Sequence, residues 1–198
     1  MNRRKTITVL VECAIMVALS VVLSFIRLFK LPLGGAVTLA SRLPVCVASI
    51  RHGVKKGALA SFVYSLFQLV FGITLDGLFG WGLTPAMLIG CMLFDDVIAF
   101  SVLCLAGLFR KKGEIGIYAG FTVAFAARFI SHFISGYVIF KNLEQWELFG
   151  KVFENKPALY SISYNGLYML PELVITLVIV VVLMRIPYVK KNILAPKD

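Results

Sequence analysis

The sequence has few charged residues, and its 10 acidic residues are half as many as its 20 basic residues. Of the 198 residues, 15% are Asp, Glu, Lys or Arg, whereas about 25% is usual for soluble domains. Hydrophobic residues make up 60% of the chain and stand in long blocks, against about 45–50% in soluble domains. This composition excludes an ordinary soluble domain and predicts a protein that crosses the membrane several times.

Motifs for nucleotide binding and hydrolysis are also absent. No G-x-x-x-x-G-K-[ST], H-E-x-x-H or G-x-S-x-G pattern occurs, which argues against a built-in ATPase, a zinc protease or a serine hydrolase. The cysteines show no C-x-x-C spacing, so we interpret Cys13, Cys46, Cys91 and Cys104 as small apolar filler. We predict no metal and no cofactor, and uphill transport would need energy from a partner or an ion gradient.

The apolar blocks predict a single domain over residues 1–198, an all-α membrane protein built as a compact bundle of six transmembrane helices. At about 20 residues per spanning helix, the chain has room for about six helices and very short loops. The second block is short, contains Pro44 and follows KLPLGGA, so it is a candidate for irregular chain packed against protein. The predicted spans are residues 6–26, 36–50, 54–73, 84–109, 116–140 and 160–185.

The basic residues predict how these helices are oriented. Thirteen of the twenty Lys and Arg residues fall at the two chain ends and in the loops that follow the second and fourth spans. By the positive-inside rule, both the N- and the C-terminus are cytoplasmic. The net charge of +10 is therefore mainly a topology signal. We expect a multi-pass protein of the bacterial plasma membrane in contact with the lipid bilayer, and no nucleic-acid partner.

Ionisable side chains inside the predicted spans are the most informative residues, because they are costly in lipid and usually face a bundle interior or a wet cavity. Asp95 and Asp96 interrupt the apolar run GCMLFDDVIAF. Neighbours on an α-helix differ by about 100°, so these two cannot point at the same object. We hypothesise a structural ion pair between Arg42 and Asp96 that leaves Asp95 for a ligand, with Arg128 as the competing partner. The full set comprises Glu12, Arg42, Asp95, Asp96, Arg128, His132 and Glu172.

A second polar cluster begins the sixth span, in LYSISYNGLYMLPELVIT. Tyr160, Tyr164 and Tyr168 place aromatic faces around the first turns, and Asn165 adds an amide. The alternative for the tyrosines is an interfacial aromatic belt. An amide that donates and accepts, near a histidine and a carboxylate, suits a polar heteroaromatic ligand.

Four stretches together resemble the thiamine-specific substrate-binding component of energy-coupling-factor vitamin importers. They read GGAVTLASRLPVCVASIRHGVKKG, DDVIAFSVLCLAGLF, RFISHFISGYVIF and YSISYNGLYMLPELVI, and the resemblance covers nearly the whole chain. It implies a non-enzymatic vitamin-binding subunit that associates with a transmembrane coupling protein and two cytoplasmic ATPase subunits. In that family an acidic residue matching Asp95 contacts the aminopyrimidine of thiamine, and further ligand residues match His132, Tyr160 and Asn165. The family's docking motif for the coupling protein is matched by Ala14 and Ala18, small residues four apart that let helix backbones approach closely.

The chain departs from that family at four positions. Asp96 stands where members often have tyrosine, and Arg42 stands where an uncharged residue is expected. Gly35 and Phe140 stand where some members have tryptophan, so two stacking surfaces differ. The candidates to replace them are Tyr137, Trp146 and Trp81.

The expected ligand site comprises Asp95, His132, Tyr160, Asn165, Tyr164, Tyr137, Phe140 and Trp81. Two alternatives keep the same fold, one in which the ligand is the precursor hydroxymethylpyrimidine or another vitamin, and one in which the protein is a proton-coupled secondary carrier. An intramembrane enzyme is disfavoured, because paired catalytic carboxylates converge whereas neighbours on a helix diverge. The loop at residues 141–159 either covers the site as a lid or lies on the membrane surface.

Overall fold

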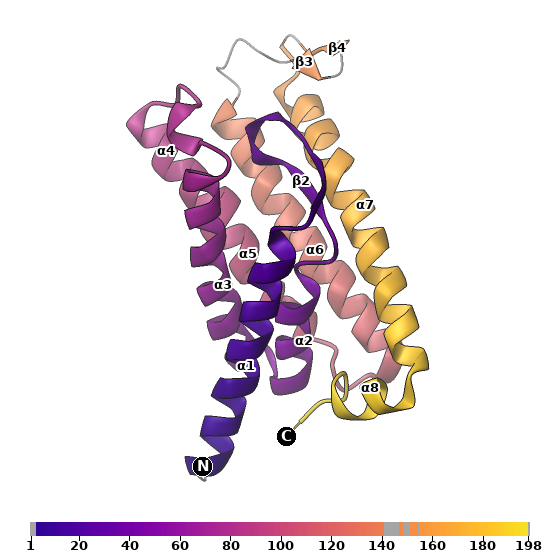
Figure 1. Cartoon of the computed structure of the whole chain (residues 1–198). Coiled ribbons are helices and arrows are strands. Elements are labelled where there is room, and N and C mark those ends of the chain that lie inside the picture. Colours follow the sequence, from indigo (N-terminus) through magenta and orange to yellow (C-terminus); the bar gives the residue numbers. More distant parts are fainter. Residues whose placement is uncertain (1–2, 141–146, 149–150, 154, 198) are drawn as a thin grey trace.

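The computed structural model describes residues 3–140, 147–148, 151–153 and 155–197. Within this part of the chain, five helical segments are long and apolar enough to cross a membrane. They pack side by side, and the two ends of the chain lie at the same end of the bundle (Figure 1). The predicted helical membrane bundle is confirmed, with two short two-stranded sheets in addition. The five segments are α1 (Arg3–Ser24), α3 (Val54–Thr74), the run Pro85–Gly107, α6 (Gly113–Val138) and α7 (Pro157–Arg185).

The second predicted span, residues 36–50, is a strand and a short helix instead of one spanning helix. Strand β1 (Arg27–Lys30) pairs antiparallel with β2 (Ala36–Thr38) across the turn η1 (Pro32–Gly34), and α2 (Leu43–His52) follows. Pro44 occupies the first turn of α2, where its missing N–H costs nothing. All of β2 and most of α2 are buried. Irregular chain thus lies against protein, as its backbone polar groups require.

The run Pro85–Gly107 changes helix type along its length. It begins as α4 (Pro85–Cys91), capped by the Thr84 hydroxyl, which accepts a hydrogen bond from Met87 N. It continues as the π-helix η3 (Met92–Ile98) and the single turn α5 (Ala99–Ser101), and it ends as the 3₁₀-helix η4 (Val102–Gly107). Asp95 and Asp96 both lie in the π segment, a type of irregularity that is frequent at functional sites.

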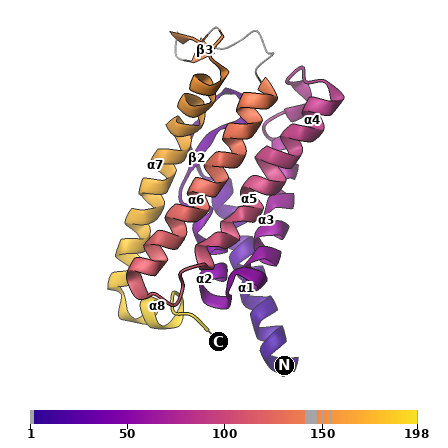
Figure 2. The ribbon, with the colours of Figure 1, turned by 180° about the vertical axis from the view of Figure 1, so that it is seen from behind.

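The remaining elements lie at the two ends of the bundle. The turn η2 (Leu78–Gly80) precedes α4, and α8 (Pro187–Asn192) follows α7 at the end that holds the chain termini. Strands β3 (Glu147–Leu148) and β4 (Lys151–Val152) pair at the opposite end, seen from behind in Figure 2. Trp146 and nine of the nineteen residues of the predicted lid, 141–146, 149–150 and 154, lie outside the described residues.

Ion pairs on Glu12 join three segments at the end that holds the termini. Glu12 Oε1 lies 2.6 Å from Lys197 Nζ, near the end of the chain. Glu12 Oε2 accepts a hydrogen bond from Arg51 Nε and lies 3.0 Å from His52 Nε2, both on α2. Leu194 is buried close by in the hydrophobic core. The C-terminal segment is therefore held against α1 and α2.

A fully buried ion cluster centred on Glu172 joins the hairpin formed by β1 and β2 to α2, α6 and α7. Arg42 Nη1 donates to Glu172 Oε1, and Arg128 Nη1 donates to Glu172 Oε2 at 3.3 Å. Thr38 Oγ1 also donates to Glu172 Oε1, at 2.6 Å. Glu172 is 0% exposed, and the two arginines are 4% and 2% exposed. Buried charges persist only when they are paired and hydrogen-bonded, as here.

This cluster corrects the hypothesis that Arg42 pairs with Asp96. Both candidate arginines, Arg42 and Arg128, pair with Glu172 instead. The physical reason is the route of the irregular chain: β2 lies against α7 and carries Arg42 there, whereas Asp96 faces α3. Among the described residues, Asp96 forms no ion pair.

Close helix packing explains one of the glycines of α6. A Cβ built on Gly120 would lie 2.2 Å from the carbonyl oxygen of Ala106 in η4, a distance that a real side chain cannot adopt. Gly166 on α7 is different, because a Cβ there would meet only Leu170 Cδ1 at 3.9 Å.

We expect Gly120→Ala to lower the thermal unfolding midpoint of the detergent-purified protein, because η4 must move away from α6 and the packing between them loosens. Gly166→Ala is the matched control. It adds the same methyl group at an open helical position and should leave the midpoint unchanged or raise it, by about 0.5–1 kcal/mol of helix stability. Equal midpoints for the two variants would contradict the close approach.

We expect Glu172→Gln to destabilise the protein by about 3–5 kcal/mol, because it removes the shared partner of two buried guanidiniums. The measurement is thermal unfolding in detergent. Glu114→Gln is the control, since Glu114 pairs with Lys190 at the surface, where both side chains are about half exposed, and its loss should leave the midpoint unchanged. A Glu172→Gln protein as stable as the wild type would remove the cluster from its structural role.

Candidate functional site

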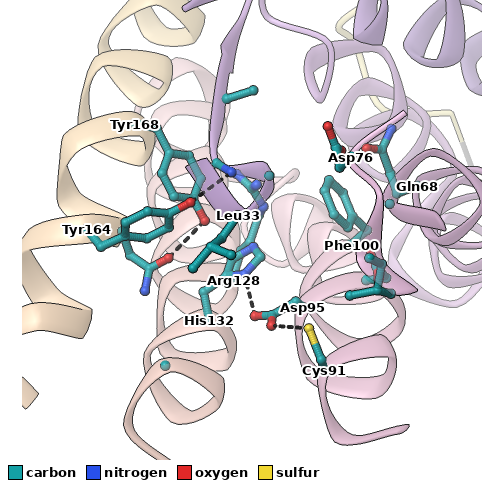
Figure 3. Close-up of a pocket in the computed structure, with 18 of the residues that line it drawn as sticks. Leu33, Gln68, Asp76, Cys91, Asp95, Phe100, Arg128, His132, Tyr164 and Tyr168 are labelled. Atoms are coloured by element: carbon teal, nitrogen blue, oxygen red, sulfur yellow. Dashed lines mark hydrogen bonds and ion pairs between the residues drawn. The ribbon is translucent and has the colours of Figure 1, made fainter. Parts of the chain in front are cut away.

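A cavity lies between the hairpin, α3, the π segment, α6 and α7 (Figure 3). Its volume is about 120 Å³, whereas a single water needs roughly 10–15 Å³. The cavity can therefore hold an organic molecule. Its wall combines aromatic rings with a small number of polar groups, which is the usual character of a small-molecule site.

Asp95 supplies a carboxylate that is held by three neighbouring side chains. Its Oδ1 lies 2.8 Å from His132 Nδ1 on α6. Its Oδ2 accepts hydrogen bonds from Ser135 Oγ and from Cys91 Sγ, the latter at 3.2 Å. Figure 3 shows Asp95 beside His132 and Cys91 at one wall of the cavity. The carboxylate is thus fixed in place and still borders the cavity.

His132 presents an unused ring nitrogen. The side chain is 8% exposed, and its Nε2 is buried without a hydrogen-bond partner in the described part of the chain. His132 lines the cavity and is packed edge-on against the rings of Phe100 and Tyr168. A buried polar atom normally has a partner, so this nitrogen is available to a bound molecule.

The polar groups of α7 form a connected chain. Asn165 Nδ2 donates to Ser161 O at 2.9 Å, and Asn165 Oδ1 accepts a hydrogen bond from Tyr168 OH, also at 2.9 Å. Asn165 is buried and lines the cavity one helix turn from Ser161 and Tyr168. Asn165 Nδ2 also donates to Ser161 Oγ, at the longer distance of 3.3 Å, and a ligand acceptor could take the place of this weaker contact.

The tyrosines of α7 hold the hairpin against the cavity. Tyr164 OH donates to Pro32 O and accepts a hydrogen bond from Gly35 N at 3.0 Å. The rings of Tyr160 and Tyr164 are stacked, with centroids 5.8 Å apart and an interplanar angle of 23°. A Cβ built on Gly35 would lie 2.8 Å from Tyr164 OH. The tyrosines therefore occupy the space in which a side chain at position 35 would stand.

Trp81 and Phe140, two further predicted site residues, also lie in the cavity wall. Their ring centroids are 6.3 Å apart, and the Trp81 indole N–H donates to Asp76 O at 3.1 Å. They form an aromatic wall where α3, α4 and the end of α6 come together.

Tyr137 corrects the predicted set. It is 45% exposed and stacked on Phe133 outside the cavity, with centroids 6.1 Å apart. The reason is helical phase: Gly136 lines the cavity, and the next residue on α6 is turned about 100° away from it.

The two aspartates of the π segment contact different helices at one cavity. Asp95 contacts α6 through His132, whereas Asp96 lies against Gly72 of α3. Both line the cavity. As expected, the two carboxylates contact different neighbours. Contrary to that expectation, however, both of them line the same cavity.

The sequence did not predict an ion pair between the β1–β2 hairpin and the end of α3. Arg27 pairs with Asp76 through both carboxylate oxygens, and Lys30 Nζ lies 2.8 Å from Asp76 Oδ1. Arg27 and Asp76 line the cavity. The signal was one acidic residue in a predicted outer loop that faces two basic residues in another. Phe100 and Cys91 gave no such signal, because apolar side chains inside a span predict ordinary core. Gln68 is polar but not ionisable, so it does not belong to the ionisable residues inside the spans that predict a site.

Residues 10–191 match the profile of the thiamine transporter protein family (Thia_YuaJ). The chain is 27% identical to the thiamine transporter ThiT of Bacillus subtilis (strain 168) over 202 residues, which cover 92% of this chain and 93% of the relative. Its fold matches the solved structure of ThiT from Listeria monocytogenes with a TM-score of 0.73 and 21% identity, covering 98% of this chain and all of the other. Because the family match spans almost the whole chain, this multi-pass membrane protein belongs to the thiamine transporter family.

Proposed function

We propose that this protein is the substrate-binding subunit of an energy-coupling-factor importer in the bacterial plasma membrane. It captures thiamine from outside and delivers it through an ATP-driven complex. The family supports transport of thiamine and no enzymatic role. The observation that carries the proposal is the convergence of Asp95, His132 and Asn165 on one aromatic-lined cavity.

The polar groups of the wall complement an aminopyrimidine. If Asp95 accepts the Nδ1–H of His132, the neutral imidazole has an acceptor at Nε2. Carboxylate and imidazole then accept from an exocyclic amine, and Asn165 Nδ2 donates to a ring nitrogen in place of its longer contact with Ser161 Oγ. Charge-assisted hydrogen bonds of this kind are roughly twice as strong as neutral ones.

The aromatic wall suits the second ring of thiamine, which carries a permanent positive charge. Trp81 and Phe140 lie close together at the cavity, and Tyr160 and Tyr164, which also line it, are stacked on each other. A cation over an aromatic face gains about 0.5–2 kcal/mol. Binding thus needs no covalent step.

The ligand assignment predicts a clear pattern in isothermal titration of the detergent-purified protein. We expect sub-micromolar binding of thiamine and a loss of at least tenfold in affinity for Asp95→Asn and for Asn165→Ala, about 1.4 kcal/mol or more each. Tyr137→Leu is the control, because Tyr137 lies outside the cavity, and its affinity should equal that of the wild type. If the protein binds riboflavin or biotin but neither thiamine nor its pyrimidine fragment, the assignment of thiamine as the ligand is wrong.

The surface of α1 supports docking of a coupling protein. Ala14 and Ala18 are exposed on the outside of the bundle, whereas Val17 and Ser20 face inward. The pair therefore does not serve packing inside this chain, and it leaves a flat track on which another helix can lie closely. Because the chain has no ATPase motif, the energy comes through such a partner with its two ATPase subunits.

We expect the double substitution Ala14→Trp and Ala18→Trp to abolish thiamine uptake by cells while leaving thiamine affinity in detergent unchanged. Bulky rings on the track keep a partner helix away but do not reach the cavity. The control is Val178→Trp on α7, which places a tryptophan on another outer surface of the bundle, at a residue that is 57% exposed. Uptake that survives the double substitution and stops when the proton gradient collapses would favour a secondary carrier instead.

A further inference from the structure

We propose that Asp96 is the counter-ion for the cationic ring of the ligand, so that this chain selects a permanent cation by charge as well as by shape. The inference rests on the proposed function, because it assigns the second ring of thiamine to a named side chain. It explains a carboxylate that the ion-pair network of the bundle does not use.

The carboxylates that border the cavity differ in their partners. Asp76 is paired with Arg27 and Lys30, and Asp95 is hydrogen-bonded to His132 and two neighbouring side chains. Asp96 also lines the cavity, yet its carboxylate has neither an ion pair nor a hydrogen bond within the described residues. Ionisable groups inside membrane helices are costly and usually serve function when no structural partner holds them.

The position of Asp96 fits the second ring. In Figure 3 the labelled residues of α6 and α7, among them His132 and Tyr164, lie at one side of the cavity, and Gln68 and Asp76 lie at the other. An aminopyrimidine held at His132 directs the rest of a two-ring ligand toward the α3 side. Asp96 stands at that side, against Gly72, where a Cβ would be 3.4 Å from both carboxylate oxygens. The absence of a side chain at Gly72 leaves this space to the carboxylate and the ligand.

The neighbouring charges give a reason for a carboxylate at this point. The Glu172 cluster holds two guanidiniums on one carboxylate, which leaves a surplus positive charge. Both guanidiniums lie against Phe100, at 4.8 Å for Arg128 and 5.4 Å for Arg42, and Phe100 lines the cavity. A cationic ligand is repelled by that surplus, because charges interact strongly in a weakly polar interior. Asp96 offsets the repulsion and attracts the ring directly.

The test compares a charged with a neutral ligand by isothermal titration of the full chain in detergent. The ligands are thiamine and its neutral fragment 4-amino-5-hydroxymethyl-2-methylpyrimidine, and the proteins are wild type, Asp96→Asn and Asp96→Leu. We expect the neutral substitutions to weaken thiamine at least tenfold and to change the affinity for the fragment less than twofold. Asp95→Asn is the matched variant, since it removes the charge next door and should weaken both ligands.

The outcomes separate this inference from the function on which it rests. If wild type binds thiamine but both Asp96 variants weaken the two ligands equally, or neither of them, the counter-ion role is overturned while the proposed function stands. If wild type binds no thiamine, the ligand assignment and this inference both fall. Should neither variant fold, wild type is titrated with a thiamine analogue in which a neutral aromatic ring replaces the thiazolium. Because the aromatic wall alone accounts for a loss of up to about 30-fold, binding more than a hundredfold weaker than that of thiamine supports the role, and a smaller loss overturns it.

Discussion

The buried carboxylate of Glu172 is the group around which the binding half of the molecule is arranged. It holds Arg42 from the start of α2, Arg128 from α6 and Thr38 from β2 at a single point on α7. Each partner alone would be an uncompensated polar group in a region without water, so none of the three segments can leave independently. The hairpin is therefore fixed to α7, and that contact brings Gly35 under Tyr164 and closes one side of the cavity.

The π segment positions the carboxylates of the cavity, just as the Glu172 cluster positions the hairpin. It sets Asp95 toward α6 and Asp96 toward α3, and both remain on the cavity. Such a segment replaces the regular helical hydrogen bonds by i→i+5 bonds, so its backbone stays hydrogen-bonded beside the cavity. The gain is two negative groups on one short stretch that serve different parts of one ligand space. This division is the opposite of a catalytic dyad, in which two carboxylates share one reacting centre.

Composition and charge were sufficient to predict the bundle, because long apolar blocks leave a membrane helix no competitor. The positions of Asp95, His132 and Asn165 in one cavity also followed, since cost in lipid and family resemblance pointed to the same residues. The partner of Arg42 did not follow. Glu172 is 130 residues away, and only the irregular path of β2 brings them together. The prediction that Tyr137 lines the site was wrong for a smaller reason. One residue along α6 turns the side chain from the cavity face, where Gly136 lies, to the outside of the bundle.

The distribution of charge also explains why a positively charged cluster and a cationic ligand can share one interior. The guanidiniums of Arg42 and Arg128 are turned toward Glu172 on α7 and lie against the ring of Phe100, and both arginines line the cavity. The carboxylates of Asp95 and Asp96 line the same cavity, from the helical run that also carries Phe100. The two guanidiniums share the carboxylate of Glu172, which offsets part of their charge, whereas Asp96 has no ion-pair partner in the described part of the chain. A cation in the cavity is therefore attracted by an uncompensated carboxylate and repelled by a partly compensated pair, because charges interact strongly in a weakly polar interior. Structural stability and the proposed ligand selection thus depend on charges of opposite sign that border one cavity.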